Sequence, residues 1–80
     1  MTIKIRAFGI AKDILSATSL SYEIPDGSTV SDLKSRLMQD YPDFDRLRSL
    51  AFAINESYVD DGNEIVQGDE VVLIPPVSGG

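Results

Sequence analysis

The sequence predicts one α+β domain in which a mixed sheet of about five strands carries one main helix across one face. Two patterns support this prediction. Several short segments alternate apolar and polar side chains, which is typical of strands that bury one face. One longer segment instead repeats its apolar residues at the spacing of a helix. At 80 residues, the chain has room for a single domain with a modest core.

The alternation of apolar and polar residues in the N-terminal part of the chain predicts two paired strands. In the first strand, residues 2–8, the alternation places Ile5 and Phe8 on opposite faces. The second strand covers residues 19–24 and turns its apolar residues inward in the same way. A short helical turn over residues 10–15 is expected to lie between the two strands.

The main helix is predicted to begin after Thr29 and to end before Pro42, because proline disfavours helix in the residue that precedes it. Asp32 follows Thr29 at the spacing of a capping box, in which each residue satisfies a backbone N–H of the other. Apolar residues then recur at helical spacing, at Val30, Leu33, Leu37 and Tyr41. Met38 is also expected at a core position of this helix.

The second half of the chain predicts three further strands. They cover residues 51–55, 57–59 and 70–74, and a short turn of helix around Phe44 precedes them. Turns rich in glycine and aspartate separate the last two strands. The predicted order is therefore strand, strand, helix, strand, short strand, strand.

This order is that of the ubiquitin-like β-grasp, in which a hairpin is followed by a crossover helix and the last strand returns to the middle of the sheet. We expect the β-grasp domain to cover residues 1–74. Residues 75–80 are expected to form a flexible C-terminal tail.

The chain contains no cysteine and no histidine. This composition excludes disulfides, thiolate nucleophiles, cysteine or histidine metal sites and catalytic triads built on histidine. The acidic residues of the second half do not follow the spacing of an EF-hand loop. We therefore expect no metal site, no permanently bound cofactor and no side-chain acid–base catalysis by this chain alone.

The formal net charge of −6 predicts the class of partner. It opposes binding to nucleic acid, which needs basic residues to neutralise phosphates, and it favours a basic surface on another protein. No apolar run is long enough to span a bilayer, and the first residues do not resemble a secretory signal. We expect no membrane partner and a cytoplasmic location.

The last six residues combine a stiff start with a slender end, Pro75-Pro76-Val77-Ser78-Gly79-Gly80. Two prolines favour an extended exit from the domain. Glycines lack a Cβ atom, so they can pass through a narrow channel and leave the terminal carboxylate open to attack. Such a carboxylate can be adenylated with ATP by another enzyme and converted to a thiocarboxylate when sulfur displaces AMP. An idle, frayed end is the alternative.

The segments IPPVSGG (residues 74–80), GDEV (68–71) and AINESYV (53–59) resemble the small subunit of molybdopterin synthase, a family of ubiquitin-like sulfur carriers. The resemblance implies that an E1-like activating enzyme adenylates Gly80 and that a sulfurtransferase supplies the sulfur. Gly79 would be the slim neighbour that lets Gly80 pass. The thiocarboxylate then gives its sulfur to cyclic pyranopterin monophosphate during molybdenum cofactor biosynthesis. The chain is thus expected to have no activity alone.

The same resemblance implies the partner and the docking residues. The tail would enter the large synthase subunit, in an assembly of two small and two large subunits. Docking would use an apolar patch and the tail residues that follow it, namely Phe8, Tyr58, Ile74, Pro75, Pro76, Val77 and Ser78. Three other functions stay open: a sulfur carrier for thiamine or another thiolated product, a ubiquitin-like modifier that forms isopeptide bonds with lysines, and a plain interaction domain.

Overall fold

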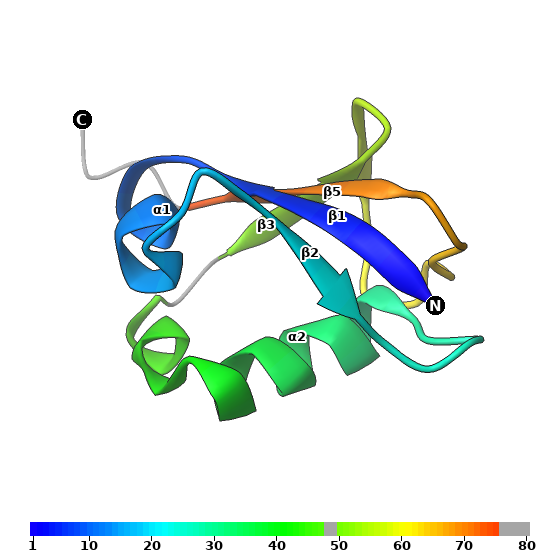
Figure 1. The fold of residues 1–80 in the computed structure, drawn as a ribbon, viewed down its shortest axis with the longest axis horizontal. Helices are drawn as coiled ribbons and strands as arrows, with labels where there is room; N and C mark the ends of the chain where they lie inside the picture. The colour runs from blue at the N-terminus through cyan, green and yellow to red at the C-terminus, as the bar shows by residue number, and fades with distance from the viewer. Residues whose placement is uncertain (48–49, 76–80) are drawn as a thin grey trace.

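The computed structural model describes residues 1–47 and 50–75 and has the predicted β-grasp architecture (Figure 1). Along the chain, its elements are β1 (Thr2–Ala7), α1 (Gly9–Leu15), β2 (Ser19–Glu23), α2 (Val30–Asp40), the 3-10 helix η1 (Pro42–Arg46), β3 (Ala51–Ile54), β4 (Ser57–Val59) and β5 (Glu70–Ile74). Each predicted strand and helix is present; the bounds of β4 and β5 are as predicted, and those of the other strands differ by one residue.

Within the described residues, the strands form one mixed sheet in the order β2-β1-β5-β3-β4. β1 pairs antiparallel with β2 and parallel with β5, and β3 pairs antiparallel with both β4 and β5. The last strand therefore lies in the middle of the sheet, as predicted. A parallel pair needs a crossover connection, and α2 lies within that connection, across one side of the sheet (Figure 1).

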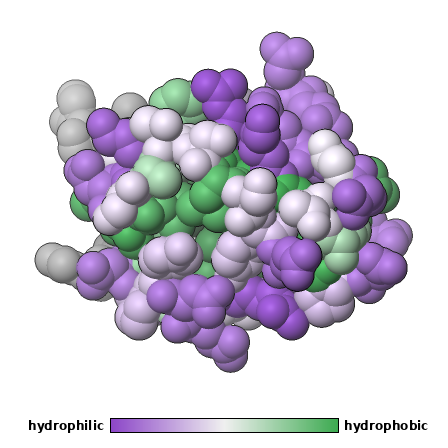
Figure 2. Space-filling model, viewed as in Figure 1, coloured by the Kyte–Doolittle hydropathy of each residue, from purple (hydrophilic) through white to green (hydrophobic). Residues whose placement is uncertain are grey.

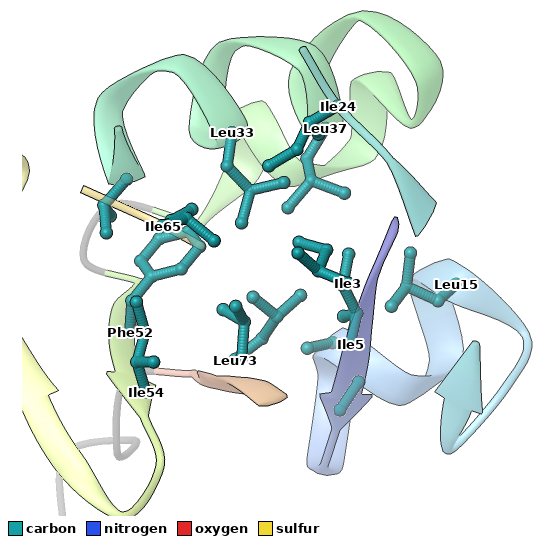
Figure 3. Close-up of a cluster of buried hydrophobic side chains, with 14 of the residues drawn as sticks. Ile3, Ile5, Leu15, Ile24, Leu33, Leu37, Phe52, Ile54, Ile65 and Leu73 are labelled. Carbon is teal, nitrogen blue, oxygen red and sulfur yellow. The ribbon is translucent and has the colours of Figure 1, made fainter. Parts of the chain in front are cut away.

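The hydrophobic core lies between α2 and the sheet. Val30, Leu33 and Leu37 face it from α2, and each is at most 1% exposed. The inward residues of three strands face them, namely Ile3, Ile5, Ala7, Phe52, Ile54, Val71 and Leu73. Figure 3 shows Leu33 pointing from the helix into the core, toward Leu73 on the sheet. Each large side chain buried here contributes roughly 1.5–3 kcal/mol, so this layer supplies most of the favourable free energy of folding.

The start of α2 is capped as predicted. The backbone N–H of Asp32 donates to Thr29 Oγ1 at 3.3 Å, and the Thr29 N–H donates to Asp32 Oδ2 at 3.0 Å. The expectation for Met38 was wrong, because this side chain is 36% exposed. Met38 follows Leu37 and therefore lies about 100° further round the helix, away from the buried stripe.

A tight turn ends β3 at Ile54, one residue earlier than predicted. Asn55 and Glu56 have φ values of 49° and 73°, which reverse the chain into β4. Asn55 Nδ2 also donates to Asp69 Oδ1 at 3.1 Å, which ties this turn to the start of β5. The turn therefore sets the register of β4, the strand at one edge of the sheet.

β2 forms the other edge of the sheet. Figure 2 shows apolar surface in the middle of the view, between the layer of the sheet and the layer of α2. Leu20 and Tyr22 are half-buried on β2, and the Tyr22 hydroxyl donates a hydrogen bond to Asp40 at the end of α2. This contact joins the two layers at the open side of the core.

Candidate docking face beside the start of the tail

The sheet face opposite α2, here called the outer face, is not covered by any described helix (Figure 1). One row of residues crosses it on four strands. The register aligns them from β1 to β4 in the order Arg6, Val72, Ala53 and Tyr58. The row has a charged residue at one end, small or branched apolar residues in its middle and an aromatic ring at the other end.

Phe8, Tyr58 and Ile74 all lie on this outer face, as their alternation predicts. Phe8 is 51% exposed and Tyr58 is 75% exposed, whereas Ile74 is half-buried. The parallel register of β1 and β5 runs up to the pair Ala7 and Leu73, so Phe8 and Ile74 follow as the next residues along their strands.

Tyr58 lies further from the other two predicted residues. Ile74 pairs with Ala51 of β3, whereas Tyr58 pairs with Ala53, the next outward-facing residue of that strand. With strands about 4.8 Å apart and about 3.4 Å between residues, Tyr58 stands roughly 12 Å from Ile74. The apolar surface is therefore a strip that runs from the ring of Phe8 to the ring of Tyr58, with Ile74, Val72 and the alanines of β3 between them.

Arg6 is a residue of this face that the sequence interpretation left out of the patch. Its guanidinium carbon lies 5.7 Å from the centroid of the Phe8 ring, and its Nη1 lies 4.0 Å from Glu70 Oε2. Both charged side chains are substantially exposed, so the ion pair contributes little to stability. The contact instead holds a positive charge over the ring of Phe8. Alternation already placed Arg6 on the same face as Phe8, but the contact with Glu70 follows only from the strand register.

The polypeptide leaves the sheet beside Gly9. Gly9 has a φ of +57°, and a β-carbon at this position would lie 3.4 Å from Pro75 Cγ. Pro75 is half-buried, so the first tail residue rests against the start of α1 and next to Phe8. The predicted tail residues Pro76, Val77, Ser78, Gly79 and Gly80 lie outside the described residues.

The rest of the described chain offers little for side-chain chemistry. Residues 1–47 and 50–75 contain no cluster of three or more potential metal ligands. Burial, helped by the hydrogen bond to Asp40, raises the pKa of Tyr22, but this residue lies on β2 and faces α2. Among the described helices, none has the length and apolarity needed to cross a bilayer. What the described residues do bring together is an exposed apolar face and Pro75, the first residue of the tail.

A model of the ThiS family matches residues 5–80, which is nearly the whole chain. The chain belongs to the ThiS family. A relative from Chlamydomonas reinhardtii, the molybdopterin synthase sulfur carrier subunit, is 32% identical over 83 aligned positions that cover all of both chains. The predicted relationship to the small subunits of molybdopterin synthase is thereby confirmed.

Solved structures share this fold. A putative molybdopterin converting factor subunit 1 from Pyrococcus furiosus superposes with a TM-score of 0.88 at 23% identity, covering 96% of this chain and 99% of that one. A protein–protein complex of subunits 1 and 2 of the molybdopterin-converting factor from Helicobacter pylori contains a chain that superposes with a TM-score of 0.69 at 26% identity, with both chains fully covered. The β-grasp fold is thereby confirmed, whereas the docking roles of Phe8, Tyr58 and Ile74 stay predictions.

Proposed function

We propose that this chain is the sulfur carrier subunit of a molybdopterin synthase and that the carboxyl group of Gly80 carries the sulfur. The observation that supports this most directly is the family match, which runs through residue 80 and so includes the two terminal glycines. The relative from Chlamydomonas reinhardtii, a molybdopterin synthase sulfur carrier subunit, aligns over its full length as well. Pro75, the first residue of the tail, lies beside Gly9, the residue that follows the exposed Phe8.

Activation comes first, because a carboxylate has no good leaving group. The Gly80 carboxylate oxygen attacks the α-phosphate of ATP on an E1-like enzyme and releases pyrophosphate, which leaves an acyl-adenylate. A hydrosulfide equivalent from a sulfurtransferase then attacks the acyl carbon, and AMP leaves. ATP is therefore used by the activating enzyme and is not held by the carrier.

Transfer follows in the large synthase subunit. The thiocarboxylate is a nucleophile at neutral pH and needs no base from the carrier. Its sulfur attacks a side-chain carbon of cyclic pyranopterin monophosphate, so that a C–S bond forms while the C–O bond at that carbon breaks and its oxygen substituent leaves. Hydrolysis of the resulting acyl–sulfur bond leaves the sulfur on the pterin and restores the Gly80 carboxylate. This division of labour suits a chain that has neither cysteine nor histidine. Adenylation depends on ATP, which suits the predicted cytoplasmic location.

The outer face would dock the large subunit while the tail enters its active site. Phe8 and Ile74 lie next to the start of the tail, and the strip ends at Tyr58 on β4. Fully extended, residues 75–80 reach about 20 Å, which is enough to carry Gly80 from this face into a neighbouring protein. The Helicobacter pylori complex pairs subunits 1 and 2 of its converting factor, and we propose a heterotetramer of two small and two large subunits here.

Intact-mass measurement tests the proposal. The full chain is incubated with the activating enzyme, ATP and a sulfurtransferase, and the expected product is heavier by the replacement of one oxygen with sulfur. A chain that lacks Gly80 is expected to keep its fold and to show no mass gain and no molybdopterin formation, because a terminal residue contributes little to stability. Omission of ATP is the control.

The outcomes separate the functions that the sequence leaves open. A mass gain with sulfur transfer to the pterin supports the proposal. A mass gain without transfer to the pterin would indicate a carrier for another thiolated product. Conjugates with lysine-bearing proteins would indicate a modifier, and no mass gain at all would indicate a plain interaction domain.

A further inference from the structure

A groove lies between α1 and η1, away from the outer face. Its volume is about 450 Å³, and three apolar and two acidic residues line it, namely Ile10, Ile14, Leu47, Asp13 and Asp43. Ile10 is 49% exposed, whereas Ile14 and Leu47 are half-buried. An exposed isoleucine above two half-buried apolar residues gives the groove an apolar floor that the described chain does not cover.

The two charged residues that line the groove are both acidic. Asp13 and Asp43 are both exposed, and neither forms an ion pair with a cation among the described side chains. A second copy of this chain, with its net charge of −6, would bring like charges together. The chain's own tail would bring the Gly80 carboxylate toward the same two aspartates. The charge therefore favours an occupant that is apolar at its centre and basic on its flanks.

The groove lies at the end of the fold where the tail begins. α1 starts at Gly9, which rests against Pro75, and Ile10 is the next residue of that helix. Figure 1 shows α1 and the end of β5 at the same end of the molecule. Phe8, on the outer face, directly precedes Gly9 and Ile10 in the chain. A protein that binds the tail and the outer face therefore lies close to the groove.

From these observations we propose that the groove between α1 and η1 is a second docking surface. It takes an apolar side chain flanked by lysine or arginine on the protein that receives the C-terminal tail. The identity of that protein rests on the proposed function, since the tail is expected to enter the large synthase subunit.

Substitution of Ile10 tests the apolar part of the proposal. The purified large subunit is titrated calorimetrically with the full chain and with Ile10→Asp, and we expect binding to weaken about tenfold. Val66→Asp is the matched control, because Val66 is 58% exposed and does not line the groove. This control is expected to bind like the unsubstituted chain. If Ile10→Asp lowers the melting temperature, Ile10→Ser replaces it without a new charge.

Substitution of the acidic residues tests the electrostatic part. We expect Asp13→Asn with Asp43→Asn to weaken binding about threefold at low salt and to flatten its salt dependence, because charges at the rim of an interface mainly steer association. Asp60→Asn is the control for removal of a negative charge elsewhere. If the double variant binds with unchanged affinity and salt dependence, the partner's side chain is not flanked by lysine or arginine and the electrostatic part of the proposal is wrong.

Two results separate a failure of the groove from a failure of the proposed function. If the unsubstituted chain does not bind the large subunit, both the proposed function and this inference are wrong. If that chain binds, Phe8→Ala weakens binding and Ile10→Asp has no effect, the outer face stands and the groove is overturned. If sedimentation shows a dimer that Ile10→Asp dissociates, the occupant is a second copy and the proposed partner is wrong.

Discussion

Gly9 and Pro75 lie side by side where the polypeptide leaves the sheet: a β-carbon on Gly9 would lie 3.4 Å from Pro75 Cγ. Gly9 also has a φ of +57°, a region that costs a residue with a side chain roughly 1–2 kcal/mol. The contact joins the first residue of α1 to the first residue of the tail. The direction in which the tail starts therefore depends on a residue near the other end of the chain.

Gly9→Ala is expected to lower stability by about 1 kcal/mol and to slow sulfur transfer about threefold. Alanine is strained at this φ, and a backbone shift that relieves the strain would move the new methyl group, which is in van der Waals contact with Pro75, and with it the start of the tail. Urea denaturation and single-turnover transfer measure the two effects. Gly27→Ala is the matched control, since Gly27 has a φ of +84° and no heavy atom within 4 Å of the added carbon. It should lose similar stability at an unchanged transfer rate. Equal slowing in both variants would mean that the contact does not guide the tail.

Phe8→Ala is expected to weaken binding to the large subunit about tenfold while lowering the melting temperature by only a few degrees. The ring is 51% exposed, so the fold alone does not bury much of it, and Arg6 covers part of one face. Calorimetric titration and thermal denaturation measure the two quantities. Val66→Ala, at another exposed apolar residue, should leave the affinity unchanged. If Phe8→Ala binds the large subunit as tightly as the unsubstituted chain, Phe8 only covers the edge of the core and does not take part in docking.

Glu56→Gly is expected to stabilise the protein by up to about 1 kcal/mol, because Glu56 has a φ of 73° and glycine adopts this conformation without steric cost. The gain is reduced because glycine also makes the unfolded chain more flexible. Urea denaturation measures the free energy of unfolding. Glu56→Ala keeps the unfavourable φ and serves as the control, with little change expected. A destabilised glycine variant would show that the Glu56 side chain stabilises the turn.

Tyr22→Phe is expected to make the protein less sensitive to alkaline pH. Burial and the hydrogen bond to Asp40 raise the pKa of Tyr22 above its ordinary value of 10.0. The protonated phenol therefore stabilises the folded state fully below pH 10, and this contribution is lost as the pH rises through the raised pKa. Free energies of unfolding measured from pH 8 to about pH 11 should fall less steeply in the variant. Tyr58→Phe controls for the loss of a tyrosine hydroxyl, and identical slopes in all three proteins would contradict the linkage.

The elements of this fold could be predicted because each depends on neighbours in the sequence. Alternation in residues 2–8 assigned both faces of β1, and the pair Thr29 and Asp32 marked the start of α2. Met38 was misplaced because the side of a helix that is buried depends on how the helix packs. Met38 lies at the margin of the apolar stripe, and one such residue does not determine how the helix is rotated about its axis against the sheet.

The candidate site divides in the same way. Phe8, Tyr58 and Ile74 were assigned to one outer face through alternation and family resemblance, and the structure places them on that face. Their distances from one another required the strand order, which places β3 between the strands of Ile74 and Tyr58. The contact of Arg6 with Glu70 and the groove at Ile10 had no signal in the sequence, because each joins segments distant in the chain.

By itself, the sequence determined which side-chain chemistry is closed to this chain: without cysteine or histidine, it has no thiolate nucleophile and no imidazole base. It also determined the local elements, since alternation, helical spacing and capping act over a few residues. Only the tertiary structure decided that Gly9 meets Pro75 and that Arg6, Val72, Ala53 and Tyr58 share one row. Register and packing arise from contacts between distant segments, whose free energies no local pattern contains.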